Sequence, residues 1–204
     1  MKKLFPVIAI IFAALAVYFL FFNKKKITVE DVKQESIVLK KHSEAFNKST
    51  DSVVNAYLDI KNAFVNADTA AAKTAARNFV LLLDRLPIDE LKKDTVTIFE
   101  TVQGNIADIK SNATSLLNQT DITEMRKDFS MVTEMMYPSF FIAINYEGPK
   151  LYVENCPMAF SDSISANWIS NNAEIVNPYM GKKHPTYHAG MLGCGSVKDS
   201  IVAK

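Results

Sequence analysis

The stretch SEAFNKSTDSVVNAYLDIKNAFVN, residues 43–66, is the part of this chain that indicates its fold class most clearly. Within it, apolar side chains recur at intervals of three and four residues, at Val53, Tyr57, Ile60 and Phe64. This spacing places apolar side chains on one face of an α-helix. We therefore expect an amphipathic helix here, with its apolar face turned toward a core.

Three further stretches downstream show the same periodicity. Asp68 and Asp121 are suitable N-cap residues at the start of two of them, and Pro87 cannot continue a helix. The expected helices cover residues 69–86, 89–119 and 121–145. Four such helices joined by short connections favour a mainly α fold, an up-and-down four-helix bundle.

The sequence pattern changes after residue 145, where Gly148 and Pro149 are incompatible with a helix. A short strand is expected from Leu151 toward Cys156, and because Pro157 follows, we expect it at the edge of a sheet. Residues 191–197 form a candidate final strand. The bundle should therefore carry a small C-terminal cap of irregular and β structure.

The N-terminus has the character of a membrane segment. Lys2 and Lys3 precede an uncharged apolar run, Leu4–Phe22, which is long enough to cross a bilayer as a helix. The run ends in aromatic residues without a small-residue cleavage site, which favours an uncleaved anchor over a cleaved signal peptide. Either segment would export the rest of the chain, so we expect it in the cell envelope, either anchored in the inner membrane with its domain in the periplasm or released there.

The predicted organisation has five parts. They are a transmembrane signal anchor or signal peptide (1–26), a tether (27–42), a helical bundle (43–145), a cap containing cysteine and methionine (146–198) and a tail (199–204).

Composition excludes some classes of function. The 204 residues carry a net charge of +1 and no basic stripe interleaved with aromatic residues, which argues against a nucleic-acid partner. There is no glycine-rich phosphate loop and no nucleophile-elbow sequence, and no histidine lies in the expected helical core. We therefore expect a protein that is not an enzyme.

Soft sulfur ligands gather in the C-terminal quarter. Both cysteines of the chain, Cys156 and Cys194, have a methionine two or three residues away, Met158 and Met191. Thiolate and thioether sulfurs together select Cu(I) most distinctively, so these four residues are the candidate metal site. A Cys156–Cys194 disulfide, two unrelated buried thiols, or a site that alternates between disulfide and metal remain open as alternatives.

Two histidines and three structural candidates complete the set of site residues. His184 and His188 are secondary metal candidates, although Pro185 between them opposes a regular helix and a solvated loop is the simpler interpretation. Trp168, the single tryptophan, is expected to anchor the cap onto the bundle. Pro178 and Tyr179 belong to an expected turn.

A set of motifs resembles a known family. They are Tyr152-Val-Glu-Asn-Cys156-Pro-Met-Ala-Phe160, Ala166-Asn-Trp-Ile-Ser170, Glu174-Ile-Val-Asn-Pro-Tyr179 and Met191-Leu-Gly-Cys-Gly195, together with upstream residues 55–64 and 68–77. Over about residues 43–197 the chain resembles domain-of-unknown-function family 3347. That domain also occurs at the C-terminal end of periplasmic adaptor proteins of heavy-metal efflux systems. Residues 182–190, which carry both histidines, look like an insertion relative to the family, so no family role extends to them.

The resemblance implies an association with copper or a related metal in the cell envelope. The expected function is non-catalytic binding of a soft metal, Cu(I), for metal tolerance or efflux, with the membrane and a heavy-metal efflux adaptor or another envelope protein as partners. The alternative is a non-catalytic interaction module of the envelope in which Cys156 and Cys194 form a structural disulfide.

Overall fold

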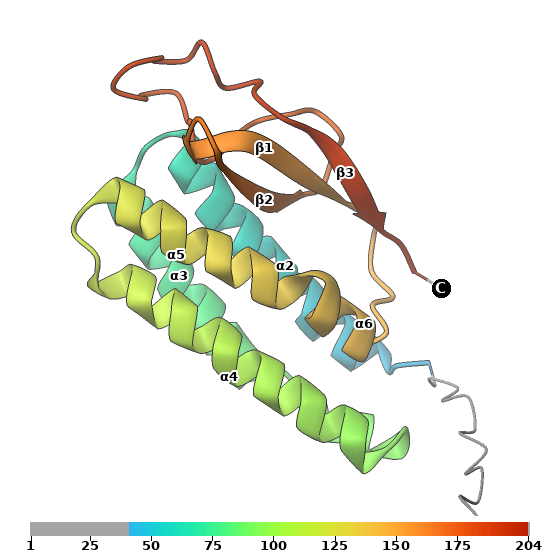
Figure 1. Cartoon of the computed structure of the whole chain (residues 1–204). Helices are drawn as coiled ribbons and strands as arrows, with labels where there is room; N and C mark the ends of the chain where they lie inside the picture. Colours follow the sequence, from blue (N-terminus) through green and yellow to red (C-terminus); the bar gives the residue numbers. More distant parts are fainter. Residues whose placement is uncertain (1–40, 204) are drawn as a thin grey trace, which may run out of the picture. The chain divides into compact units, whose positions relative to one another are not determined.

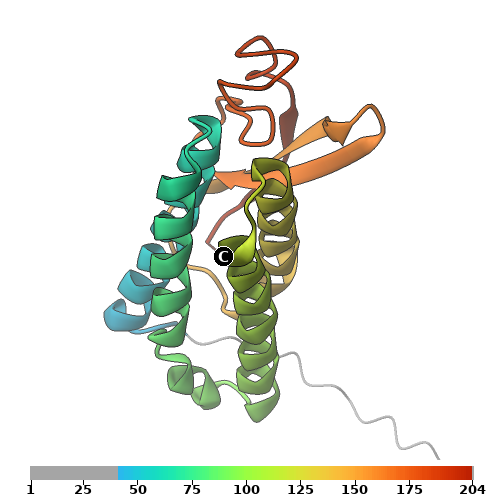
Figure 2. The same cartoon turned by 90° about the vertical axis from the view of Figure 1, so that its left-hand side faces the viewer.

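Four helices form the main body of the protein in the computed structural model, which describes residues 41–203 (Figure 1). The chain runs along them in alternating directions (Figure 2). They are α2 (Glu44–Val65), α3 (Thr69–Asp84), α4 (Val96–Asn118) and α5 (Ile122–Met135). The prediction of a mainly helical fold is confirmed. The predicted membrane segment and most of the tether lie outside the described residues. Among residues 41–203, no helix is both long and apolar enough to cross a membrane.

Each of these helices begins at a residue whose side chain accepts a hydrogen bond from a first-turn backbone N–H. These N-caps are Ser43, Asp68, Thr95 and Asp121. An N-cap satisfies backbone donors that have no partner within the helix and contributes about 1 kcal/mol to helix stability. The two N-caps expected from the sequence, Asp68 and Asp121, are confirmed.

Two of the predicted helices are interrupted. The expected helix over residues 89–119 is instead a 3₁₀ helix, η1 (Ile88–Lys93), followed by α4, because Thr95 is extended and caps a new helix. The last helix changes at η2 (Met136–Phe140) to π-type bonding and then ends in a short α6 (Phe141–Ala143). The cause lies at Pro138, which lacks a donor and pushes the preceding residue out of the helical region.

The C-terminal cap is a three-stranded antiparallel sheet in the order β2-β1-β3. Its strands are β1 (Leu151–Ser161), β2 (Ile164–Ser170) and β3 (Ser196–Ile201). β3 therefore begins near the end of the predicted strand (191–197) and includes residues assigned to the tail. The cause of this error is the lack of a clear apolar–polar alternation, since β3 exposes most of its side chains.

The prediction that the strand containing Pro157 lies at the edge of the sheet is wrong. β1 is the central strand, yet its pairing with β3 extends only from Leu151 to Asn155. Its register with β2 is also irregular between Cys156 and Ser161. Pro157 therefore lies where β1 has lost its second partner, a place where a missing N–H is tolerated.

The sheet packs on the helical body through α2 and α5 (Figure 1). Tyr57 of α2 stacks on Phe129 of α5, and its hydroxyl lies 2.6 Å from Thr133 Oγ1. The same hydroxyl accepts a hydrogen bond from the backbone N–H of Ile169 in β2. One fully buried side chain thus joins two helices and the sheet.

Candidate metal site

The two cysteines, 38 residues apart in the sequence, meet in the structure. Cys156 Sγ and Cys194 Sγ lie 2.8 Å apart, and both residues are free thiols. The pairing of β1 with β3 accounts for this approach. Asn155 is the register partner of Ser196, so the residues flanking these two positions, Cys156 and Cys194, are brought to the same end of the β1–β3 ladder. Cys156 is fully buried and Cys194 is half-buried.

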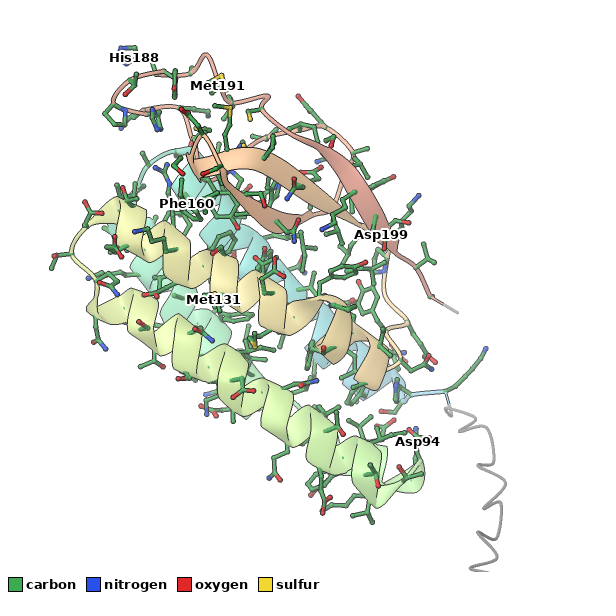
Figure 3. All side chains as sticks on the ribbon, in the orientation of Figure 1. Asp94, Met131, Phe160, His188, Met191 and Asp199 are labelled. Atoms are coloured by element: carbon green, nitrogen blue, oxygen red, sulfur yellow. The ribbon has the colours of Figure 1, made fainter. Side chains whose placement is uncertain are left out.

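A tight turn places Met191 close in the chain to Cys194. The Cys194 N–H donates to the Met191 carbonyl at 3.0 Å, which closes a four-residue turn. Figure 3 shows Met191 in the loop before β3, nearer to the strands than His188. This turn occupies the first part of the candidate strand 191–197, and β3 begins only at Ser196.

Asn177 holds this turn in place. The sequence indicated only that this asparagine belongs to a turn, and not that it binds the segment around Cys194. The backbone N–H of Asn177 donates to the Leu192 carbonyl, and its side-chain amide donates to the Cys194 carbonyl, both at 2.8 Å. Its Oδ1 accepts from the N–H groups of Tyr179 and Met180. Asn177 is completely buried. The Asn-Pro dipeptide was the available sequence signal, since asparagine side chains commonly bond to backbone two residues on.

Gly195 allows the turn to lie against β1. Its φ is +139°, and a Cβ added there would lie 2.7 Å from the Asn155 carbonyl oxygen and 2.9 Å from the Trp168 ring. Any side chain would push the turn, and Cys194 with it, away from the strand. The glycine is thus required by both backbone conformation and space.

The three structural candidates lie at the interface between sheet and helices. Trp168 is completely buried, and its ring packs edge-to-face on Tyr179 with centroids 6.0 Å apart. Tyr179 also contacts Phe160 and Phe129, and its hydroxyl donates to the Asn167 carbonyl. Pro178, between Asn177 and Tyr179, is buried.

The two candidate methionines are partly buried. Met158 and Met191 both pack against the hydrophobic core, as Cys194 does. Met158 follows Cys156 by two residues in β1, although the bulge after Cys156 interrupts regular alternation. The structure thus brings the thiols of Cys156 and Cys194 together, whereas the thioethers of Met158 and Met191 pack against the hydrophobic core.

The two histidines lie in an exposed loop. His184 and His188 form an isolated antiparallel bridge, and the ring of His184 stacks on Tyr187. His184 Nδ1 accepts from the backbone N–H groups of Thr186 and Tyr187, each at 3.2 Å. In neutral imidazole this leaves the proton on Nε2, so neither nitrogen offers a free lone pair to a metal.

No cluster of three or more histidine, cysteine or acidic side chains that could hold a metal occurs within residues 41–203. A metal at Cys156 and Cys194 would therefore have two thiolate ligands, with any others coming from thioethers or from outside this part of the chain. Such a low-charge sulfur site suits a soft monovalent ion better than a divalent one.

Burial and the neighbouring Cys156 thiol raise the pKa of Cys194 to about 11. The thiol is therefore protonated at neutral pH. A protonated thiol is a weak nucleophile, and a metal must displace its proton to bind.

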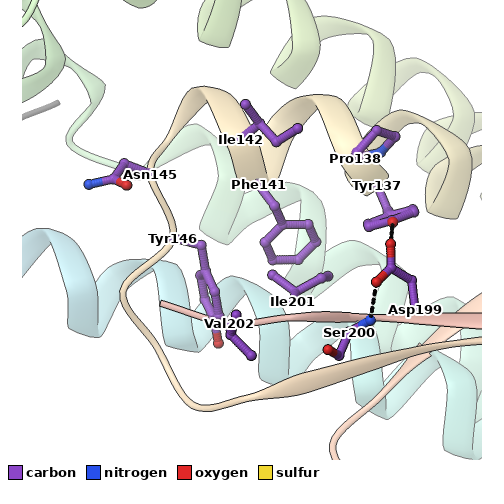
Figure 4. A pocket seen from close by; sticks show the side chains of 10 residues that line it. All are labelled: Tyr137, Pro138, Phe141, Ile142, Asn145, Tyr146, Asp199, Ser200, Ile201 and Val202. Atoms are coloured by element: carbon purple, nitrogen blue, oxygen red, sulfur yellow. Dashed lines mark hydrogen bonds between the residues drawn. The ribbon is translucent and has the colours of Figure 1, made fainter. Parts of the chain in front are cut away.

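A separate hollow of about 260 Å³ lies between η2, α6 and β3 (Figure 4). Its polar groups bond to one another, since the Tyr137 hydroxyl donates to the Asp199 carboxylate, which also accepts from the Ser200 N–H. The acceptor raises the pKa of Tyr137 to about 12. The tyrosine hydroxyl and the carboxylate of this hollow are thus hydrogen-bonded to each other.

Comparison with known proteins gives one match. Residues 53–143 match the family model described as "Protein of unknown function (DUF3347)". No curated protein and no solved structure matches the chain. The match ends before β1, so it covers most of the helical body and neither cysteine. The family resemblance is confirmed over this shorter range, in which the helical body is similar to the DUF3347 family.

Proposed function

We propose that this chain is a non-catalytic protein of the cell envelope that binds a soft metal ion, Cu(I), through Cys156 and Cys194. One observation carries the proposal, namely that two thiols from distant parts of the chain lie 2.8 Å apart. Met158 and Met191 act as auxiliary thioether ligands. The biological role is metal tolerance or delivery to an efflux adaptor.

Metal binding requires a small movement of the thiols. A thiolate–metal bond is about 2.3 Å long for zinc, so two sulfurs on one tetrahedral ion lie about 3.8 Å apart. The sulfurs must therefore separate by roughly 1 Å from their present distance. Cys156 is fixed in the buried central strand, whereas Cys194 belongs to a half-exposed turn, so the turn is the part that moves.

The sequence supports the location in the envelope. Leu4–Phe22 is an uncharged apolar run flanked by lysines at both ends, and such a run anchors a chain in a membrane. The match of residues 53–143 to the DUF3347 model agrees with this context, since the sequence resemblance connects that domain with periplasmic adaptors of metal efflux.

A competition titration with a Cu(I)-specific chelator tests the metal proposal. Wild-type protein should retain one Cu(I), and Cys156→Ser and Cys194→Ser should each weaken binding at least tenfold. Met158→Leu and Met191→Leu should have smaller effects. Met131→Leu, which changes an exposed methionine of α5, serves as the matched control and should bind like wild type. A Cys156→Ser/Cys194→Ser double variant that is folded and keeps wild-type affinity would refute the proposal.

The second candidate is an envelope interaction module whose cysteines form a structural disulfide. The short distance between the thiols favours it, because little movement is needed to form the bond. Closing this loop would stabilise the cap by roughly 3–4 kcal/mol if the disulfide acts by restricting the unfolded chain. Thiol titration and intact mass of the unreduced protein separate the two functions, with two free thiols expected for the metal site and none for the disulfide.

A further inference from the structure

A cavity of about 450 Å³ lies away from the sulfur residues, and none of the four lines it. It is bounded by the N-terminal ends of α3 and α5, the end of β1, and the loop that carries Lys183 and His184. Figure 3 shows Phe160, one of its wall residues, between β1 and α5. The volume falls in the range of small-molecule pockets.

A buried guanidinium with spare donors lines this cavity. Arg126 is only 4% exposed, and its Nη2 donates to the Phe64 carbonyl at 2.9 Å. Within residues 41–203, its Nε has no hydrogen-bond partner, and no carboxylate lies within ion-pair distance of the guanidinium. Gly181 leaves room for the guanidinium, since a Cβ there would lie 2.5 Å from Nη2. An arginine held in this way has unused donors in a fixed orientation, and it retains its charge at neutral pH although burial lowers its pKa to about 10.

The other polar groups of the cavity are mainly donors. Lys183 brings an exposed ammonium group, and His184 presents an Nε2–H because its Nδ1 already accepts two backbone bonds. The N-terminal ends of α3 and α5 add positive potential. Among the described residues that line the cavity, one is acidic, Asp121. Its carboxylate caps α5 and accepts hydrogen bonds from the N–H groups of Thr123 and Glu124.

The remaining walls are apolar and aromatic. Phe160, Tyr179, Ile122 and Pro185 line the cavity beside the charged groups. Arg126 and Lys183 carry two positive charges and Asp121 carries one negative charge, so the cavity favours a ligand with a single negative charge. The apolar walls favour a ligand whose remaining part is hydrophobic.

We propose that this cavity binds a small organic anion, with its anionic group at Arg126 and Lys183 and its apolar body against Phe160 and Pro185. This cavity shares no residue with the four sulfur residues. Anion binding can therefore be tested independently of metal binding.

Calorimetry on the full-length chain at low ionic strength tests this proposal, with benzoate as the probe and benzamide as its neutral counterpart. Benzoate should bind saturably at one site, whereas benzamide and inorganic phosphate should bind at least tenfold more weakly. Lys183→Ala should weaken benzoate binding several-fold. Lys198→Ala, which removes the same charge from exposed β3, should leave it unchanged.

Arg126→Gln should abolish benzoate binding, and circular dichroism will show whether this buried substitution leaves the fold intact. The exposed Lys183→Ala variant keeps the test decisive if Arg126→Gln does not fold. Three results would each overturn the proposal, namely no saturable benzoate binding, equal binding of benzamide, or wild-type binding by Lys183→Ala.

Discussion

Glu154 is a completely buried carboxylate in the central strand of the sheet. Neither of its oxygens has a hydrogen-bond partner among the residues that the structure describes. The indole of Trp168 and the ammonium of Lys61 lie near enough to favour its charged form, but Lys61 Nζ donates to Ser170 instead, at 3.4 Å. Desolvation prevails over both neighbours and raises the pKa of Glu154 to about 7.

This shift predicts a particular dependence of stability on pH. Between its ordinary value of 4.5 and about 7, folded Glu154 holds a proton that the unfolded chain has released, so its contribution to the free energy of unfolding falls as pH rises through this window. Glu154→Gln should remove that contribution. Relative to wild type, the variant should gain about 1–3 kcal/mol between pH 4 and pH 8 in urea unfolding.

The exposed Glu174→Gln substitution is the matched control and should retain the pH dependence of the wild type. Parallel stability curves for wild type and Glu154→Gln over this range would show that the carboxylate is already ionised in the folded protein, which contradicts a raised pKa.

Gly195 is the subject of the second prediction about a single residue. Gly195→Ala should destabilise the protein by about 2–3 kcal/mol, because the new Cβ meets backbone and the Trp168 ring at a positive φ. Gly193→Ala, in the same turn, has open space around its Cβ and should change stability by less than about 1 kcal/mol. Thermal unfolding measures both, and equal effects would contradict the requirement for glycine at position 195.

Among the secondary-structure elements, the contact between helices and sheet depends on Tyr57. Its hydroxyl donates to Thr133 in α5 and accepts from the Ile169 N–H in β2. Thr133 in turn donates to the Phe129 carbonyl. Because these side chains are buried, removing the hydroxyl leaves a backbone donor without a partner, which is costlier than the loss of one hydrogen bond in water.

Tyr57→Phe should therefore lower the free energy of unfolding by about 1–3 kcal/mol. Tyr187→Phe, at an exposed position, should lie within about 0.5 kcal/mol of wild type. Amide exchange at Ile169 should also accelerate in Tyr57→Phe. A stability indistinguishable from wild type would show that this hydroxyl does not join the elements energetically.

The elements also show where sequence reasoning succeeds. Helices with an apolar stripe that begins after a recognisable capping residue, such as α3 and α5, could be predicted because periodicity and N-cap agree there. The break before Thr95 could not, since the apolar stripe continues across it. β3 was misplaced because its exposed side chains show no alternation, and its place is set by pairing with β1.

In the molecule as a whole, the pairing of β1 with β3 creates the candidate site. Local spacing in the sequence singled out the four sulfur residues as candidates. It could not predict the contact between Cys156 and Cys194, the hydrogen bonds of Asn177 or the arginine-lined cavity, which depend on contacts between residues distant in the chain.

The raised pKa of Cys194 predicts how metal affinity depends on pH. Cu(I) must displace the thiol proton at every pH below about 11, so the apparent affinity should rise by at least about tenfold for each pH unit between 6 and 8. Competition with a chelator, corrected for the chelator's own protonation, measures this slope. An affinity that does not change with pH would mean that Cys194 is not a ligand or is already ionised.

X-ray absorption spectroscopy at the copper edge identifies the metal ligands themselves, on the full-length chain loaded anaerobically with one equivalent of Cu(I). We predict a first shell made of sulfur, with at least two sulfur atoms, which disappears in the Cys156→Ser/Cys194→Ser variant. A first shell of nitrogen or oxygen, or a sulfur shell that survives in that variant, would refute the assignment of Cys156 and Cys194 as the metal ligands.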